Sequence, residues 1–199
     1  MRVAVGLKSH SGWSVAVTIA SNGRTLELVD RRRIELVEPE DLSWAKQPYH
    51  SAEHMESKAA KLLVERAIKS AYRIAAREIG RLKNDIEKSG HNVAAIAVLM
   101  PAPMPDWRTE EILAVHPRMH KAEGVLYPEA LADAVVTRGL RLVDIREKQL
   151  DEIAGRAFGE KFADTTARLA AIGKAAGPPW RKDQRISALA AVIALAGTA

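Results

Sequence analysis

VAVGLKSHSGWSVAVTIASNG, residues 3–23, opens the chain with two runs of β-forming residues joined by a turn. Val3, Val5 and Leu7 alternate with smaller residues, and the run 13–19 is again rich in β-branched residues. Between them Ser11-Gly12 can form a turn, and Asn22-Gly23 is typical of a second tight turn. Residues 25–37 predict a third strand, so we expect a three-stranded antiparallel meander before any helix.

The rest of the chain alternates between helical and strand patterns. Residues 51–88 carry apolar side chains at three- and four-residue steps, which predicts one long amphipathic helix. The run 93–100 is continuously apolar, as in a strand covered on both faces. A helical segment interrupted by Pro117 and Pro128, a fifth strand and three further helices are then predicted at residues 109–138, 140–145, 149–158, 162–172 and 182–196.

Length and composition favour a single domain over residues 1–199. A chain of 199 residues with 47% hydrophobic and 28% charged residues can bury a full core and shows no bias towards disorder. The absence of cysteine excludes disulfides and thiolate metal sites, and suits a cytoplasmic location. The amino terminus lacks an export signal pattern, and the most apolar run, residues 186–195, is too short to span a bilayer, so we expect no membrane association.

The order of elements resembles the ribonuclease-H-like fold, and within it the RuvC Holliday-junction-resolvase-like branch. In that branch strand four precedes a helix with a small Ala-x-Gly patch, then a strand and further helices, and Ala122-Glu123-Gly124 with residues 140–145 and 149–155 follow the same order. The resemblance covers most of the chain. It implies an α/β fold with a five-stranded mixed sheet, three antiparallel strands followed by two parallel ones, flanked by helices.

The resemblance also implies which acidic residues to look for. Nucleases of the family hold two divalent metal ions with an aspartate on strand one, an acid at the end of strand four and one or two acids on the last helix. The matching positions here are Lys8, then Met100 and Pro101, and finally Asp183, or Ser187 in an alternative register. One carboxylate does not hold two Mg²⁺ ions. We therefore expect a degenerate nuclease centre, and Mg²⁺ or Mn²⁺ as cofactor only if the site is active.

Histidines and acids form a second constellation. His50, Glu53 and His54 match the H-x-x-E-H pattern of inverted zinc peptidases, which makes His50 and His54 candidate metal ligands. His120 follows His116 by four residues and precedes Glu123 by three. In the ribonuclease-H layout these residues could converge with Lys8, His10 and Asp183 in an altered catalytic site. The alternatives are that residues 50–54 form the first turn of a helix capped by Ser51, and that the polar cluster is an internal hydrogen-bond network.

Cationic residues suggest nucleic acid as a partner. The net charge is +5, and the candidate contacts to phosphate are His10, Arg31, Arg32, Trp180, Arg181 and Lys182. Residues 177–183 lead into a helix amino terminus, which can receive a phosphate. The alternative is a solvated charged surface with Trp180 packed against the protein. No Walker loop, G-x-G-x-x-G or G-x-S-x-G motif is present, so nucleotide hydrolysis, dinucleotide redox chemistry and nucleophile-elbow hydrolysis have no local support.

Three functions remain open on the sequence alone. The leading hypothesis is a nuclease-like domain that binds nucleic acid or a protein partner and does not cleave by the usual two-metal mechanism. The second is a metal-dependent nuclease or hydrolase with an altered site made of Glu53, His54, His120, Glu123 and Asp183. The third is a structural module, such as a homodimer formed through the edge strand at residues 25–37.

Overall fold

Five strands form one mixed sheet in the computed structural model, which describes residues 1–23 and 25–197. The strands lie in the order β3-β2-β1-β4-β5. β2 pairs antiparallel with β1 and β3, whereas β4 pairs parallel with β1 and β5. Their bounds are β1 Arg2–His10, β2 Trp13–Ser21, β3 Leu26–Glu35, β4 Asn92–Met100 and β5 Leu142–Arg146. The predicted five-stranded mixed sheet is confirmed, with β3 at one edge.

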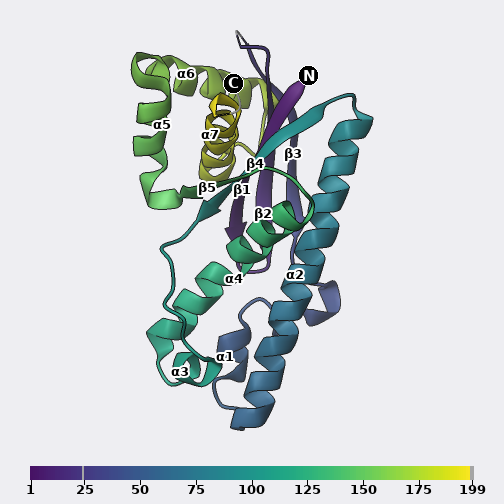
Figure 1. Cartoon of the computed structure of the whole chain (residues 1–199), viewed down its shortest axis with the longest axis vertical. Coiled ribbons are helices and arrows are strands. Elements are labelled where there is room, and N and C mark those ends of the chain that lie inside the picture. Colours follow the sequence, from purple (N-terminus) through teal and green to yellow (C-terminus); the bar gives the residue numbers. More distant parts are fainter. Residues whose placement is uncertain (24, 198–199) are drawn as a thin grey trace.

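Helices cover both faces of this sheet (Figure 1). The helices of the described residues are α1 Pro48–Ala52, α2 Ser57–Lys88, α3 Thr109–Leu113, α4 His116–Thr137, α5 Leu150–Phe158, α6 Phe162–Ala176 and α7 Lys182–Ala196, of which α1 and α3 lie beyond the end of the sheet. Val3, Val5 and Leu7 of β1 pack with α2 and α4, whereas Ala4 packs with α5, α6 and α7. The alternation of side chains along β1 therefore divides the core into two layers. Among the described residues, no helix is long and apolar enough to cross a bilayer.

Gly6 lets α7 lie directly on β1. A Cβ atom at Gly6 would stand 1.8 Å from the backbone oxygen of Ser187, and Ser187 is fully buried. No side chain larger than hydrogen fits there without moving backbone. This close contact brings the start of α7 to the carboxyl end of β1, where Lys8 and His10 follow Gly6 at two-residue steps on the same face of the sheet.

The helix predicted over residues 51–88 is wrong at its start. Two helices, α1 and α2, are separated by residues 53–56. The Glu56 carboxylate accepts hydrogen bonds from the backbone N–H groups of Lys58 and Ala59, so this side chain begins α2. Ser51 is not the cap, since its hydroxyl donates to the carbonyl of Trp44. Local capping thus overrides the apolar periodicity, and His50 and His54 do not share a helix face.

The segment predicted as helical over residues 109–138 is also divided. The short helix α3 ends at Leu113, and α4 begins at His116 with Pro117 in its first turn. Proline suits this position because the first turn does not need its missing N–H group. Pro128 lies inside α4, which continues to Thr137. His116 and His120 therefore occupy the first two turns of α4.

Candidate functional site

The carboxyl ends of the parallel strands β1, β4 and β5 lie side by side, and we call this end of the sheet the sheet edge. The family resemblance places a metal centre there. Lys8 lies near the end of β1, and its Nζ is 2.7 Å from Oε2 of Glu147, which directly follows β5. Both side chains are partly buried, with exposed fractions of 18% and 32%. The aspartate position of strand one thus carries an ammonium group that is already paired with a carboxylate.

His10 and Asp183 form a second pair at the same edge. Nε2 of His10 lies 3.0 Å from Oδ2 of Asp183, in the first turn of α7. The His10 ring stacks on Trp13 at a centroid distance of 4.3 Å, and the guanidinium of Arg33 lies 3.9 Å from the centroid of the Trp13 ring. Asp183 is therefore held by an imidazole that is itself fixed by stacking.

The other expected acidic positions carry no acid. Met100 ends β4 and Pro101 follows it, and the alternative position on α7, Ser187, has a buried hydroxyl with no hydrogen-bond partner. Glu147 was missed by sequence reasoning. The signal that could have found it is its place immediately after the fifth strand, because the ends of parallel strands meet at one edge.

A cavity of about 740 Å³ opens beside these pairs. Its apolar lining residues include Met100, Leu150 and Ile186, and its cationic lining residues are Arg146, Lys148 and Lys182. Glu147 and Asp151 also line it. Arg146 donates a hydrogen bond to the carbonyl of Pro101, while Lys148 and Lys182 are exposed.

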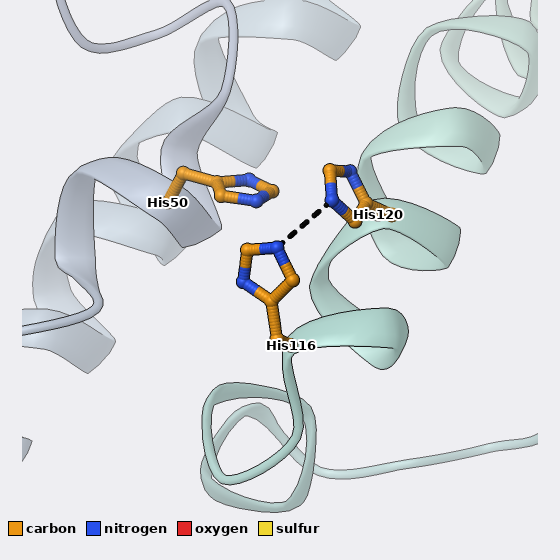
Figure 2. Close-up of side chains that lie close together, drawn as sticks. All are labelled: His50, His116 and His120. Carbon is orange, nitrogen blue, oxygen red and sulfur yellow. Dashed lines mark hydrogen bonds between the residues drawn. The ribbon is translucent and has the colours of Figure 1, made fainter.

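The histidines gather elsewhere, where α1 meets α4. His50 from α1 faces His116 and His120 from α4 (Figure 2), and one ring nitrogen from each lies within 4.8 Å of the other two. Nε2 of His116 and Nε2 of His120 are 3.1 Å apart. Apolar residues of the four helices α1 to α4 pack together nearby and hold this arrangement, namely Tyr49, Ala52, Ala60, Val64, Ile112, Met119 and Ala122.

The Glu123 side chain holds His50 in place by two hydrogen bonds. Its carboxylate accepts hydrogen bonds from the backbone N–H and the Nδ1 of His50, at 3.1 and 2.7 Å, and only 4% of its side chain is exposed. Burial and the Glu123 charge together raise the pKa values of the Tyr49 and Tyr127 hydroxyls. On the outer side, Oε1 of Glu53 lies 3.6 Å from Nδ1 of His116.

The structure thus divides the predicted site residues into two groups. One group lies around His116 and contains His50, Glu53, His120 and Glu123. In the other group, on the α7 face, Asp183 pairs with His10 and Lys8 pairs with Glu147. Figure 1 shows α1 and the start of α4 beyond the end of the sheet, away from α7. His54 is exposed after the end of α1 and is not one of the three clustered histidines. The spacing of His116 and His120 was noticed in the sequence, but the pairing with His50 needed the fold.

Most of the side chains predicted to contact phosphate bind other groups of the protein instead. Arg31 donates hydrogen bonds to the carbonyls of Gly177, Pro178 and Pro179. Arg32 lies 2.5 Å from an oxygen of Asp30 and 2.7 Å from one of Asp85.

The segment that leads into α7 is likewise fixed by internal contacts. The Trp180 indole packs closely against Gly173, and the Arg181 backbone N–H donates to the side chain of Gln184. Of the predicted contacts on this segment, Lys182 lines the cavity at the sheet edge.

Comparison with known proteins supports the fold. Neither a family model nor a curated protein matches the sequence. Among solved structures, the chain is similar to Thermus thermophilus RuvC at 10% identity and a TM-score of 0.50, covering 96% of this chain and 92% of that one. A second match is T. thermophilus RuvC in complex with a Holliday junction substrate, at 11% identity, a TM-score of 0.49, and coverage of 97% and 92%. The fold is therefore ribonuclease-H-like and similar to that of RuvC.

Proposed function

We propose that this protein is a nuclease-like domain that binds nucleic acid at the carboxyl ends of β1, β4 and β5 without two-metal cleavage. The pairing of Lys8 with Glu147 at 2.7 Å carries the proposal. The Lys8 ammonium stands at the position where strand one would supply a metal ligand, and the pair occupies the Glu147 carboxylate.

The charges at this edge oppose a pair of divalent ions. Mg²⁺ and Mn²⁺ sites need several oxygen ligands, and two of the carboxylates at this edge are already paired, Glu147 with the Lys8 ammonium and Asp183 with the His10 imidazole. Asp151, the third, is an exposed side chain of the cavity. An ion at this place would also be repelled by the Lys8 ammonium. Cleavage by the usual mechanism therefore lacks its ligands.

The same edge suits a phosphate backbone. Lys148, Lys182 and Arg146 line a cavity large enough for a nucleotide unit, and Lys8 neutralises Glu147, which also lines it. Ligands of open α/β sheets bind outside the carboxyl ends of the strands, and phosphate contacts made by lysine and arginine account for most of non-specific affinity. The net charge of +5 favours the encounter with a polyanion.

Binding is tested by fluorescence anisotropy with a labelled four-way DNA junction, a duplex and a single strand over a range of salt concentrations. We expect affinity that falls with salt, and a slope of log Kd against log salt that decreases by roughly 1 for each phosphate contact removed. The test variants are Lys148→Glu and Lys182→Glu. Lys58→Glu is the matched control, because Lys58 is an exposed residue of α2 outside the cavity.

Two results would contradict the proposal. One is an absence of salt-dependent binding to all three probes, which would direct attention to a protein partner. The other is equal loss of affinity in the Lys182 and Lys58 variants, since this would mean that the cavity is not the contact. Cleavage of any probe in Mg²⁺ or Mn²⁺ that is abolished by Asp183→Asn would overturn the claim that two-metal catalysis is absent.

A further inference from the structure

We propose that His50, His116 and His120 form a binding site for one divalent transition-metal ion, for which zinc is the best fit, with an open fourth position. The proposal does not depend on nucleic-acid binding, because it uses other residues on another part of the fold. It goes beyond the pattern of His50, Glu53 and His54 in the sequence, since it excludes His54 and requires His116.

The spacing of the ring nitrogens fits a tetrahedral ion. Zinc binds imidazole nitrogen at about 2.0–2.1 Å, which places tetrahedral ligands roughly 3.3 Å apart. The Nε2 atoms of His116 and His120 are 3.1 Å apart, and all three ligand atoms lie within 4.8 Å of one another. Because Glu123 holds the His50 ring, the adjustment to this spacing falls to the exposed side chains of His116 and His120.

The orientation of the rings also favours a shared ion over stacking. The His116 ring is nearly perpendicular to the rings of His50 and His120, with interplanar angles of 90° and 89°. In Figure 2 the rings from α1 and α4 converge on a common space. In a perpendicular pair one ring turns its edge towards the other, and between His116 and His120 the atoms in contact are the two Nε2 nitrogens.

His50 carries the strongest single indication. Its Nδ1 donates to Glu123, which leaves Nε2 as the nitrogen with a free lone pair, and this Nε2 is buried without a hydrogen-bond partner. Buried polar atoms nearly always have a partner. A metal ion bound to Nε2 would provide one, and an imidazole fixed at its other nitrogen by a carboxylate is the usual arrangement behind a zinc ligand.

Charge and exposure fit a site that an ion can enter. Glu123 is buried beside His50 and Glu53 lies beside His116, so two carboxylates lie next to the three imidazoles. His116 and His120 are exposed, which leaves one side of the cluster open to solvent. Three protein ligands with an open position are typical of catalytic rather than structural zinc sites, where water or an anionic group takes the fourth place.

The rival interpretation is an internal hydrogen-bond network with no metal. In that case the contact between His116 and His120 is an imidazole hydrogen bond, and the buried Nε2 of His50 has no role. The two interpretations differ in what happens when the metal ion is added to the protein.

The test is a calorimetric titration of the chelator-treated protein with Zn²⁺. A separate sample is titrated with Co²⁺ as a spectroscopic probe. We expect one ion per chain and visible Co²⁺ absorption bands of tetrahedral intensity. His116→Ala and His120→Ala should each weaken Zn²⁺ binding at least 100-fold and abolish the bands. Both residues are exposed on α4, so the variants are expected to fold, and circular dichroism checks this.

His54→Ala is the matched control, because His54 is a nearby exposed histidine outside the cluster. It should bind Zn²⁺ like the wild type. Absence of stoichiometric binding in the wild type, or equal losses in the His54 and His116 variants, would overturn the proposal.

Glu123 is a positioning residue, and its conservative variant separates positioning from mere folding. Glu123→Gln keeps the shape but weakens the acceptor for Nδ1 of His50, so Zn²⁺ affinity should fall about 10- to 100-fold while the Co²⁺ spectrum keeps its tetrahedral form. An unchanged affinity would contradict the role of Glu123. Lys182→Glu should leave Zn²⁺ binding unchanged, so failure of the nucleic-acid proposal and failure of the metal proposal can be told apart.

Discussion

The edge of the sheet and the histidine cluster differ in how their polar atoms are partnered. At the edge, Glu147 is paired with Lys8 and Asp183 with His10. In the cluster, Glu123 fixes one nitrogen of His50 and leaves the other buried and unpartnered. The place of a residue in the fold therefore does not decide whether it can bind a metal ion. What decides this is whether its donor and acceptor atoms already have partners, and by that criterion the histidine cluster is the better metal site.

The largest effect is expected where α7 meets β1. Gly6→Ala should lower the free energy of unfolding by about 3 kcal/mol, because the new methyl group meets the backbone of Ser187 and cannot be accommodated by a side-chain rotation. Urea unfolding followed by circular dichroism measures this.

Gly124→Ala is the matched control next to the histidine cluster. Gly124 is an exposed residue of α4 with open space around its Cα, so alanine should be neutral or add up to about 1 kcal/mol of stability. Comparable destabilisation by both variants would mean that the close packing at Gly6 is not special.

The next prediction concerns how much Zn²⁺ and Mg²⁺ each stabilise the folded protein. At a free Zn²⁺ concentration 100 times Kd, the wild-type protein should gain about 2.7 kcal/mol of stability, since the ion binds the folded state. His116→Ala, with a Kd at least 100-fold higher, should gain at most about 0.4 kcal/mol at the same Zn²⁺ concentration. Saturating Mg²⁺ should not stabilise either protein. A thermal-shift measurement with and without each ion checks this, and stabilisation by Mg²⁺ would contradict the account of the sheet edge.

Removal of a carboxylate should cost more in the cluster than at the edge. Glu123→Ala leaves the His50 backbone N–H and Nδ1 without their acceptor, so we expect a loss of about 2 kcal/mol. Glu147→Ala should cost below about 1 kcal/mol, because its ion pair is partly exposed and screened by water. Urea unfolding of both variants gives the comparison, and a larger loss for Glu147 would reverse the ranking.

The smallest effect concerns the reconstruction of an acidic edge. Lys8→Asp removes the ammonium and sets a carboxylate near Glu147 and Asp183, so weak Mn²⁺ binding, with Kd of about 1 mM, should appear where the wild type shows none. Electron paramagnetic resonance of free Mn²⁺ measures it, with Zn²⁺ added first to occupy the histidine cluster. Equal Mn²⁺ binding by wild type and variant would show that Lys8 does not exclude the ion.

The sheet could be predicted from the sequence because its signals are local. Alternation at Val3, Val5 and Leu7 and the turn at Asn22-Gly23 act over a few residues, and the apolar run 93–100 identifies a buried strand. The start of α2 could not be predicted from periodicity, since Ala52 and Met55 fit the apolar pattern while the Glu56 side chain caps a new helix. The apolar periodicity would continue one helix through residues 53–56, but the hydrogen bonds of the Glu56 side chain begin a new helix at Ser57.

The candidate site could be predicted only in part. The spacings of His116, His120 and Glu123 along one helix are local and were visible. Their meeting with His50 depends on how α1 packs against α4, which is tertiary information. The pairing of Lys8 with Glu147 joins residues 139 positions apart, and no short motif announces it.

The most direct test is one crystal structure of protein soaked with both Zn²⁺ and Mn²⁺, with anomalous data collected on either side of the zinc absorption edge. The account predicts a zinc peak among His50, His116 and His120, and no peak beside Lys8, Glu147 and Asp183. A manganese peak at the sheet edge with none among the histidines would contradict it, and would restore a metal centre at the place the fold resemblance indicates.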